Sequence, residues 1–177
     1  PISITPCMNK VMEKMINNHL MWFLENNKIL NNNQCCFRKF HNCHDNIVKL
    51  HRTITKALML KKINITIFLD MLKTFDKIWI EGLLLKMRII GLSWKIVNWI
   101  TDFLLGRTFR VDYNGIFSDV FHCGNGVPQG SCFRPTLFLL MTNFPTLSSD
   151  TLWLSFADDN ALSYCGTSIV ELILRAQ

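Results

Sequence analysis

Long apolar runs are missing from this sequence. No stretch approaches the roughly 18 apolar residues that a membrane-spanning helix needs, and no basic segment followed by an apolar run opens the chain. The sequence therefore predicts neither a membrane span nor a secretory signal, and we expect an intracellular protein that works without a membrane.

Internal repeats, low-complexity tracts and convincing linkers are also missing, which argues against a repeat architecture. Charged residues make up only 18% of the 177 residues, whereas 49% are hydrophobic. A chain of this length and composition can bury one substantial core, so we expect one compact domain. Lys and Arg outnumber Asp and Glu by 19 to 13, a balance that favours polyanionic partners without proving one.

Cysteines are present but lack the even, regular spacing of a secreted disulfide framework. The seven are Cys7, Cys35, Cys36, Cys43, Cys123, Cys132 and Cys165. We expect them to be reduced. Cys35, Cys36 and Cys43 lie close to His41 and His44, but the spacings fit neither a C-x₂-C pair nor H-x₃₋₅-H, so the sequence does not predict a zinc site there.

Hydrophobic periodicity predicts two helices in the first third of the chain. Residues 7–26 form an amphipathic pattern in which Met8, Met12 and Met15 share the apolar face, and we expect this methionine stripe to lie in the core. A second helix follows the Asn-rich break at residues 31–33. Its polar side carries Lys49, Arg52 and Lys56, which indicates either a solvated face or contact with a phosphate backbone.

After the second predicted helix, the hydrophobic pattern changes from that of a helix to that of a strand. Residues 63–69 are β-branched and apolar, which predicts a mostly buried strand that ends directly in Asp70. Helices are predicted over residues 81–90 and from Ser93 to Gly106. Asn114-Gly115 between two short strands predicts a hairpin with a type I′ turn.

The last third contains a glycine-rich loop and two adjacent carboxylates. Residues 124–131 are a plain connecting loop or one that lets a ligand approach the backbone, and a helix is predicted over residues 136–141. Asp158 and Asp159 lie at the bend between two predicted strands, at residues 152–157 and 161–164. Alone, such a pair is more typical of an ordinary turn than of a metal site.

Six ordered blocks together resemble the reverse transcriptase domain of non-LTR, jockey-like retrotransposons. The blocks are Pro1-Ile2-Ser3 with the following helix, Gln34 with Phe37-Arg38-Lys39, residues 68–77 from Phe68 to Lys77, residues 106–111 from Gly106 to Val111, residues 126–131 from Gly126 to Ser131, and Phe156-Ala157-Asp158-Asp159. Their order and separations match, and the resemblance covers essentially the whole chain.

The resemblance implies an α+β fold, that of a right-hand polymerase. It implies a fingers-like part at residues 1–62 and a palm-like part at residues 63–177, the palm being ferredoxin-like with an antiparallel sheet packed on helices. We expect the chain to be a fragment in which the thumb and the endonuclease are absent.

The resemblance also implies a catalytic site. Asp70, Asp158 and Asp159 match the family's metal-binding carboxylates, so the implied cofactor is a pair of Mg²⁺ ions, with Mn²⁺ as a possible substitute. Nucleotidyl transfer to a primer 3′-hydroxyl uses two such ions, and hard cations of this kind require oxygen ligands.

Four further residues match the family's nucleotide-binding positions. Phe75 matches the aromatic steric gate that selects deoxynucleotides, and Gln129 and Gly130 match the turn that lines the nucleotide pocket. Arg38 matches a fingers cation that meets the triphosphate. Taken alone, Phe75 is more typical of core packing and Arg38 of a solvated surface.

The implied partners are an RNA template, a DNA primer and deoxynucleoside triphosphates, and the implied locations are nucleus and cytoplasm. Several positions depart from the family pattern: Cys36 replaces a Gly and we expect it to strain its loop, Phe40 stands where the family usually has Gly, and Arg134 brings a cation to the start of a helix. These departures keep a second hypothesis open, a catalytically inactive remnant that retains only nucleic-acid or protein binding.

Overall fold

The structure, a computed structural model, describes residues 3–71, 74–143 and 151–176. Rather than one compact body, the chain forms two compact units, each made of two segments. The first unit consists of Pro1–Ile29 and Lys73–Thr142, and the second of Leu30–Leu72 and Asn143–Gln177. The predicted division into fingers and palm at residue 62 is a different kind of boundary and stays a prediction.

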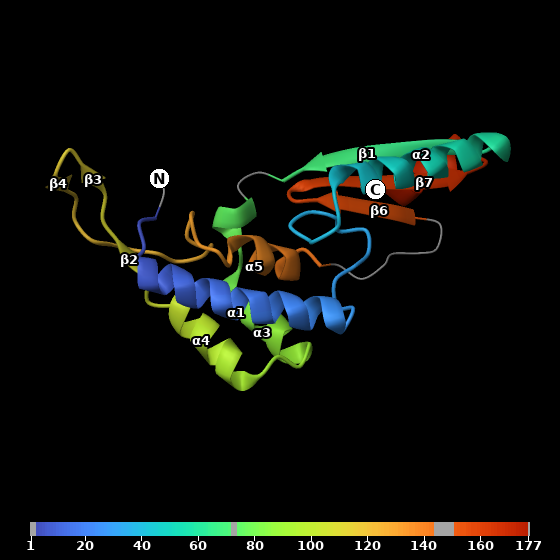
Figure 1. The fold of residues 1–177 in the computed structure, drawn as a ribbon. Coiled ribbons are helices and arrows are strands. Elements are labelled where there is room, and N and C mark those ends of the chain that lie inside the picture. Colours follow the sequence, from blue (N-terminus) through green and yellow to red (C-terminus); the bar gives the residue numbers. More distant parts are fainter. Residues whose placement is uncertain (1–2, 72–73, 144–150, 177) are drawn as a thin grey trace. The chain divides into compact units, whose positions relative to one another are not determined.

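The first unit is mainly helical (Figure 1). Its elements are α1 (Cys7–Asn26), η1 (Thr74–Lys77), α3 (Ile80–Ile89), α4 (Trp94–Leu104), β2 (Thr108–Phe109), β3 (Asp112–Tyr113), β4 (Ile116–Phe117), β5 (Phe121–His122) and α5 (Arg134–Met141). Helix α5 is the core of this unit: it packs against α1 and α3, and its residues from Thr136 to Leu140 are all buried.

Helix α1 has the predicted bounds, but its predicted orientation is wrong. Met8 and Met15 are 77% and 63% exposed, whereas Glu13, an acidic residue of the same helix, is 1% exposed. The buried side instead runs from Glu13 to Leu20 and Leu24, positions that share one helix face. Glu13 is buried because it finds hydrogen-bond partners in the loop before α5, which an apolar pattern does not reveal.

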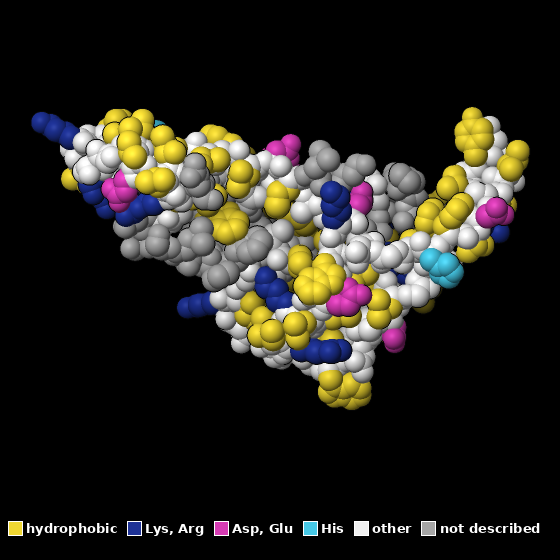
Figure 2. All heavy atoms as spheres, turned by 180° about the vertical axis from the view of Figure 1, so that it is seen from behind, with side chains coloured by type: hydrophobic (Ala, Val, Ile, Leu, Met, Phe, Trp, Pro, Cys, Tyr) yellow, Lys and Arg dark blue, Asp and Glu magenta, His cyan; other side chains and the backbone are white. Residues whose placement is uncertain are grey.

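The predicted hairpin is confirmed. Asn114 and Gly115 both have positive φ, 51° and 81°, as a type I′ turn requires, and strands β3 and β4 pair antiparallel on either side. The side chains of this hairpin are exposed, including Tyr113 and Ile116 at 74% each; Figure 2 shows them as the projection on the right.

The second unit is a three-stranded antiparallel sheet with two helices (Figure 1). Its elements are α2 (Cys43–Met59), β1 (Ile63–Asp70), β6 (Thr151–Phe156), β7 (Asp159–Gly166) and α6 (Ile169–Ala176). The strand order is β1-β7-β6. Helix α2 packs on β1 and β6, and α6 packs on β7.

Strand β1 has the predicted position but not the predicted burial. None of its eight residues is buried, and Phe68 is 74% exposed. The reason is its place at the edge of the sheet, where it pairs with β7 alone. The expectation of a mostly buried strand is therefore wrong.

Some motif residues of the sequence analysis, at positions 1–2 and 72–73, lie outside the described residues. Among the helices that are described, none combines the length and the apolar character needed to cross a membrane.

Candidate active site

Three carboxylates meet at one end of the sheet in the second unit. Asp70 is the last residue of β1 and lies directly opposite Asp159, the first residue of β7. Residues opposite each other in an antiparallel pair point to the same face, with Cβ atoms about 5 Å apart. Asp158 precedes Asp159 in the turn between β6 and β7. The structure thus brings together carboxylates that lie almost 90 positions apart in the chain.

A tight turn presents Asp158. Phe156 pairs with Asp159, so only Ala157 and Asp158 connect the two strands. Ala157 has φ 56°, a left-handed conformation that is unfavourable for a residue with a Cβ by about 1–2 kcal/mol. Asn160 donates its side-chain amide to the Asp158 carbonyl over 2.9 Å, which helps to hold this conformation.

The segment before α2 braces the same hairpin. The backbone N–H of Cys35 donates to the Ser155 carbonyl over 3.1 Å, and the N–H of Ser155 donates to the Asn33 carbonyl over 3.0 Å. The neighbouring Cys36 thiol is buried against the turn, where burial raises its pKa to about 11 although the N–H groups of Phe37 and Ala157 partly offset this. Because the thiolate is the reactive form, Cys36 is an inert packing residue at neutral pH.

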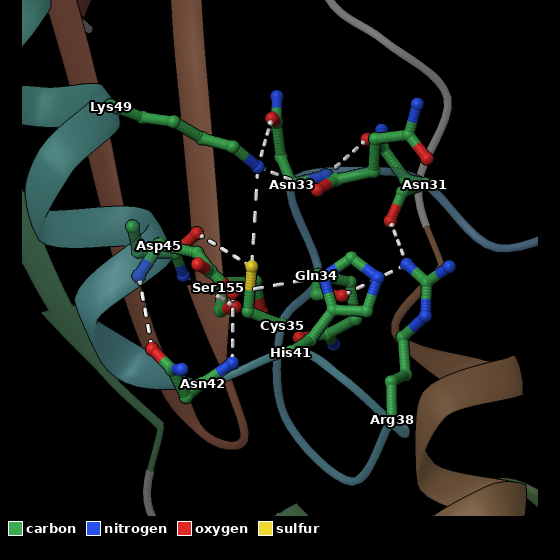
Figure 3. A network of polar contacts seen from close by, with 12 residues as sticks. Asn31, Asn33, Gln34, Cys35, Arg38, His41, Asn42, Asp45, Lys49 and Ser155 are labelled. Atoms are coloured by element: carbon green, nitrogen blue, oxygen red, sulfur yellow. Dashed lines mark hydrogen bonds and ion pairs between the residues drawn. The ribbon is translucent and has the colours of Figure 1, made fainter.

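Arg38 also belongs to the second unit, and its guanidinium binds within the protein. Its Nη1 donates to the carbonyls of Asn31 and Gln34 over 2.8 and 3.0 Å, and the residue is 9% exposed. The solvated surface role considered from sequence alone is therefore wrong. Figure 3 shows the guanidinium beneath the loop that it closes.

Phe75 lies in the first unit, in η1. Its ring packs on Phe138 of α5 with 4.3 Å between centroids, and the Arg134 guanidinium lies 4.6 Å from the Phe75 centroid. Arg134 also approaches Asp76 Oδ1 at 3.5 Å. These two contacts offset the unfavourable position of a cation at the start of α5.

The loop with Gln129 and Gly130 lies next to η1 in the same unit. The N–H of Val127 donates to the Phe75 carbonyl over 3.3 Å, and the N–H of Gly126 donates to the Ile78 carbonyl over 3.0 Å. A Cβ on Gly126 would approach the Asp76 carbonyl oxygen to 2.6 Å, so glycine is required for this contact. Gln129 and Gly130 themselves are exposed.

Three anchors hold this loop. Ser3 donates its N–H to the Gln129 carbonyl over 2.8 Å, and Arg107 donates from Nη2 to the Gly126 carbonyl over 2.7 Å. Glu13 Oε2 accepts from both Ser131 Oγ and the Cys132 N–H, each over 2.8 Å. Burial lowers the pKa of Arg107, but guanidinium remains protonated in proteins.

Sequence reasoning missed Glu13 and Arg107 as residues that position the loop. Arg107 lies within one of the recognised blocks, so the block was a signal for it. Glu13 had no such signal, because in the helical pattern it reads as part of the solvated side.

The three aspartates bring oxygen ligands of the kind that a hard divalent cation takes to one end of the sheet in the second unit. Carboxylate oxygens are the ligands that Mg²⁺ prefers, and the three aspartates supply them from two neighbouring strand ends. Asp70 and Asp159 are exposed and Asp158 is partly exposed, so their side chains can turn toward an ion. By their chemistry the residues fit the metal that the resemblance implies, although their carboxylate oxygens do not all lie within 4.8 Å of one another.

The chain matches the family model described as reverse transcriptase (RNA-dependent DNA polymerase) over residues 1–176. This chain belongs to the reverse transcriptase family. It is 32% identical over 179 residues to the RNA-directed DNA polymerase from mobile element jockey of Drosophila funebris, a match that covers 97% of this chain and 19% of the relative.

Two reverse transcriptases of Drosophila melanogaster are similar to it as well. The jockey polymerase of that species is 31% identical over 96% of this chain and 19% of its own length. The probable RNA-directed DNA polymerase from transposon X-element is 31% identical over 93% of this chain and 18% of its own length. The reverse transcriptase chain described here thus spans about a fifth of the length of the curated relatives it matches.

Proposed function

We propose that this chain carries the catalytic centre of an RNA-directed DNA polymerase of a non-LTR retrotransposon. The reaction extends a DNA primer from its 3′-hydroxyl with deoxynucleoside triphosphates on an RNA template. Membership of the reverse transcriptase family and the likeness to jockey polymerases support this reaction.

One observation carries the proposal: Asp70 and Asp159 lie opposite each other in the β1–β7 pairing, with Asp158 in the adjoining turn. An ordinary Asp-Asp turn has no need of a third carboxylate on the neighbouring strand. Carboxylates from adjoining strand ends supply the oxygen ligands that a hard divalent cation requires.

We assign metal binding to Asp70, Asp158 and Asp159. When bound, Mg²⁺ ions supply an activated 3′-hydroxyl and stabilisation of the charge on the leaving pyrophosphate. The protein's own part is to hold the carboxylates on paired strands, with the β6–β7 turn braced by the segment around Cys35. Mn²⁺ offers a similar preference for oxygen and is expected to substitute.

We assign nucleotide binding to Phe75, Gln129, Gly130 and Arg38. The backbone hydrogen bond from Val127 to Phe75 connects the proposed steric gate, Phe75, to the Pro-Gln-Gly loop. The two segments would therefore meet the ribose and the base of the nucleotide as one rigid unit. Arg38 would contribute to triphosphate binding through the donors that its two carbonyl contacts do not use.

The finer fold proposal is a right hand with a fingers-like part at residues 1–62 and a ferredoxin-like palm at residues 63–177. The antiparallel β1-β7-β6 sheet, with α6 packed on it, supports the palm. Action at nuclear DNA after synthesis in the cytoplasm follows from the same proposal.

Primer extension tests the function. On a poly(A) template with an oligo(dT) primer and Mg²⁺, we expect extension by this chain and its loss, by about 10³-fold or more, in Asp158→Asn. Asp119→Asn is the matched control: Asp119 is an exposed aspartate of the first unit, and its variant should extend normally. Extension that survives Asp158→Asn would refute the assignment.

A binding remnant without polymerase activity is the second candidate. The observation that favours it is that Arg38 donates to the carbonyls of Asn31 and Gln34. These hydrogen bonds occupy, within the fold, part of the guanidinium that a triphosphate would need. No extension by the unmodified chain, together with retained binding of a primer–template duplex, would establish this candidate.

A further inference from the structure

A second cluster of metal-ligating side chains lies at the N-terminal end of α2. One ligand atom each from Cys35, His41 and Asp45 lies within 4.8 Å of the others. It is the one such group of His, Cys, Asp and Glu found in residues 3–71, 74–143 and 151–176. Figure 3 shows the three residues converging from the loop before α2 and from its first turn.

We propose that Cys35, His41 and Asp45 bind a single zinc-like divalent ion. A thiolate, an imidazole nitrogen and a carboxylate oxygen form a donor set of the kind that zinc takes in proteins. With a thiolate, a neutral imidazole and a carboxylate, the formal charges of ligands and ion sum to zero, so burial of the loaded site carries no net charge.

Two of the three proposed ligands can be reached from solvent. His41 Nδ1 lies 3.9 Å from Asp45 Oδ2, and these two side chains are 31% and 40% exposed. Cys35, in contrast, is fully buried. The ion would enter from the side of His41 and Asp45 and meet the sulfur beneath, with a water molecule completing a tetrahedral site.

Neighbouring groups already hold the ligands in position. The Asn42 N–H donates to Asp45 Oδ2 over 2.9 Å, and the backbone of Cys35 is held by its hydrogen bond to the Ser155 carbonyl. Burial raises the pKa of the Cys35 thiol, and the Lys49 ammonium, 4.0 Å from Cys35 Sγ, partly offsets this by favouring the thiolate. Such contacts around the ligands fix their orientation and strengthen metal binding.

Coordination requires one proton to leave. In the metal-free protein the Cys35 thiol lies 3.0 Å from Asn46 Oδ1 and donates to it. The ion replaces that proton on sulfur, and the proton passes to the buffer, so that one is released for each ion bound.

Two of the three ligands also have an explanation without a metal. Asp45 closes the capping box of α2 with Asn42, and His41 can pair with Asp45 as a simple ion pair. Neither explanation requires a buried thiol against the same pair. The sequence did not predict this site because a carboxylate completes it, and the spacing rules consider only Cys and His.

Titration with Zn²⁺ alone, followed by calorimetry, tests the proposal on the full 177-residue chain. We expect one tight site per chain, and Co²⁺ bound there should show a sulfur-to-cobalt charge-transfer band. Cys35→Ser should abolish that band, and Asp45→Asn, which keeps a hydrogen-bond acceptor for Asn42, should weaken Zn²⁺ binding by at least about tenfold.

The control is the double variant Cys43→Ser, His44→Ala. Cys43 Sγ and His44 Nδ1 are exposed and lie 3.8 Å apart, so they are the neighbouring pair best able to capture an ion adventitiously. Unchanged binding in this control supports the proposal, whereas loss of binding here, or a cobalt band that persists in Cys35→Ser, overturns it. If Cys35→Ser fails to fold, His41→Ala, whose side chain is partly exposed, takes its place with the same expected tenfold loss.

Discussion

Single residues with a left-handed backbone mark where this chain stores strain. Phe37, Phe40 and Ala157 have φ of 55°, 66° and 56°, and all three belong to the second unit, with Ala157 next to Asp158. In the loop where Cys36 replaces a Gly, the positive φ falls on the next residue, Phe37, and Cys36 itself has none. Strain of this kind often lies near functional sites.

Phe40 offers the clearest test of this strain. It is 90% exposed, so its side chain contributes little packing, and it stands where the family usually has Gly. We expect Phe40→Gly to be more stable than Phe40→Ala by about 0.5–1 kcal/mol, because Gly adopts positive φ freely while losing some chain entropy on folding. Urea denaturation followed by circular dichroism measures the difference.

Leu60 is the control position for that comparison. It is 56% exposed and has φ −87°, so Gly has no conformational advantage over Ala there. A Gly variant that gains stability at both positions would contradict the explanation by backbone strain.

At the scale of elements, α1 and the loop before α5 are joined by one buried carboxylate. Glu13 Oε2 accepts from Ser131 and Cys132, while Oε1 is buried and makes no hydrogen bond to any residue that the structure describes. A buried charge is retained at a cost, and here it fixes the residues that follow Gln129 and Gly130.

Removing this carboxylate should loosen the loop. Glu13→Ala leaves two donors without an acceptor, and each unpaired buried donor costs about 1–3 kcal/mol, so we expect a loss of unfolding free energy of about 2 kcal/mol or more. Glu81→Ala, at an exposed glutamate of α3, should cost less than about 1 kcal/mol. Chemical denaturation of both variants provides the measurement, and equal losses would show that Glu13 is no anchor.

At the scale of the whole molecule, the proposed metal-binding residues and most of the proposed nucleotide-binding residues belong to different compact units. Asp70, Asp158 and Asp159 lie in the second unit, whereas Phe75 and the Gln129 loop lie in the first. Each group is built within its own unit, by strand pairing in one case and by loop anchors in the other. Substitutions of the aspartates should therefore change the rate of nucleotide transfer, whereas substitutions of Phe75 or the Gln129 loop should change which nucleotide is selected.

Phe75→Val should relax sugar selection while the carboxylates continue to work. We expect the ratio of kcat/KM for ribonucleotides to kcat/KM for deoxynucleotides to rise by about tenfold or more, because a smaller side chain admits the 2′-hydroxyl. The ratio is measured on one preparation, so it is insensitive to stability lost at the contact with Phe138.

Phe103→Val applies the same change to another half-buried ring of the first unit, one stacked on Trp99 at 5.6 Å. This control should leave the ratio unchanged. An unchanged ratio in Phe75→Val itself would mean that Phe75 is only a packing residue.

By itself, the sequence determined the elements and the family. Periodicity predicted α1 at its observed bounds, Asn114-Gly115 predicted the hairpin turn, and Asp70 was expected at a strand end, because helical and strand periods and turn chemistry are local properties. The ordered blocks indicated a reverse transcriptase because each block is a short run of residues that can be recognised in the sequence itself.

Only the tertiary structure decided which faces are buried and which distant residues meet. Burial of Glu13 in place of the methionine stripe depends on partners almost 120 positions away, and the exposure of β1 depends on its place at the sheet edge. The pairing of Asp70 with Asp159 and the grouping of Cys35, His41 and Asp45 arise likewise from strand register and loop closure. These are contacts between separate segments, and no local pattern encodes them.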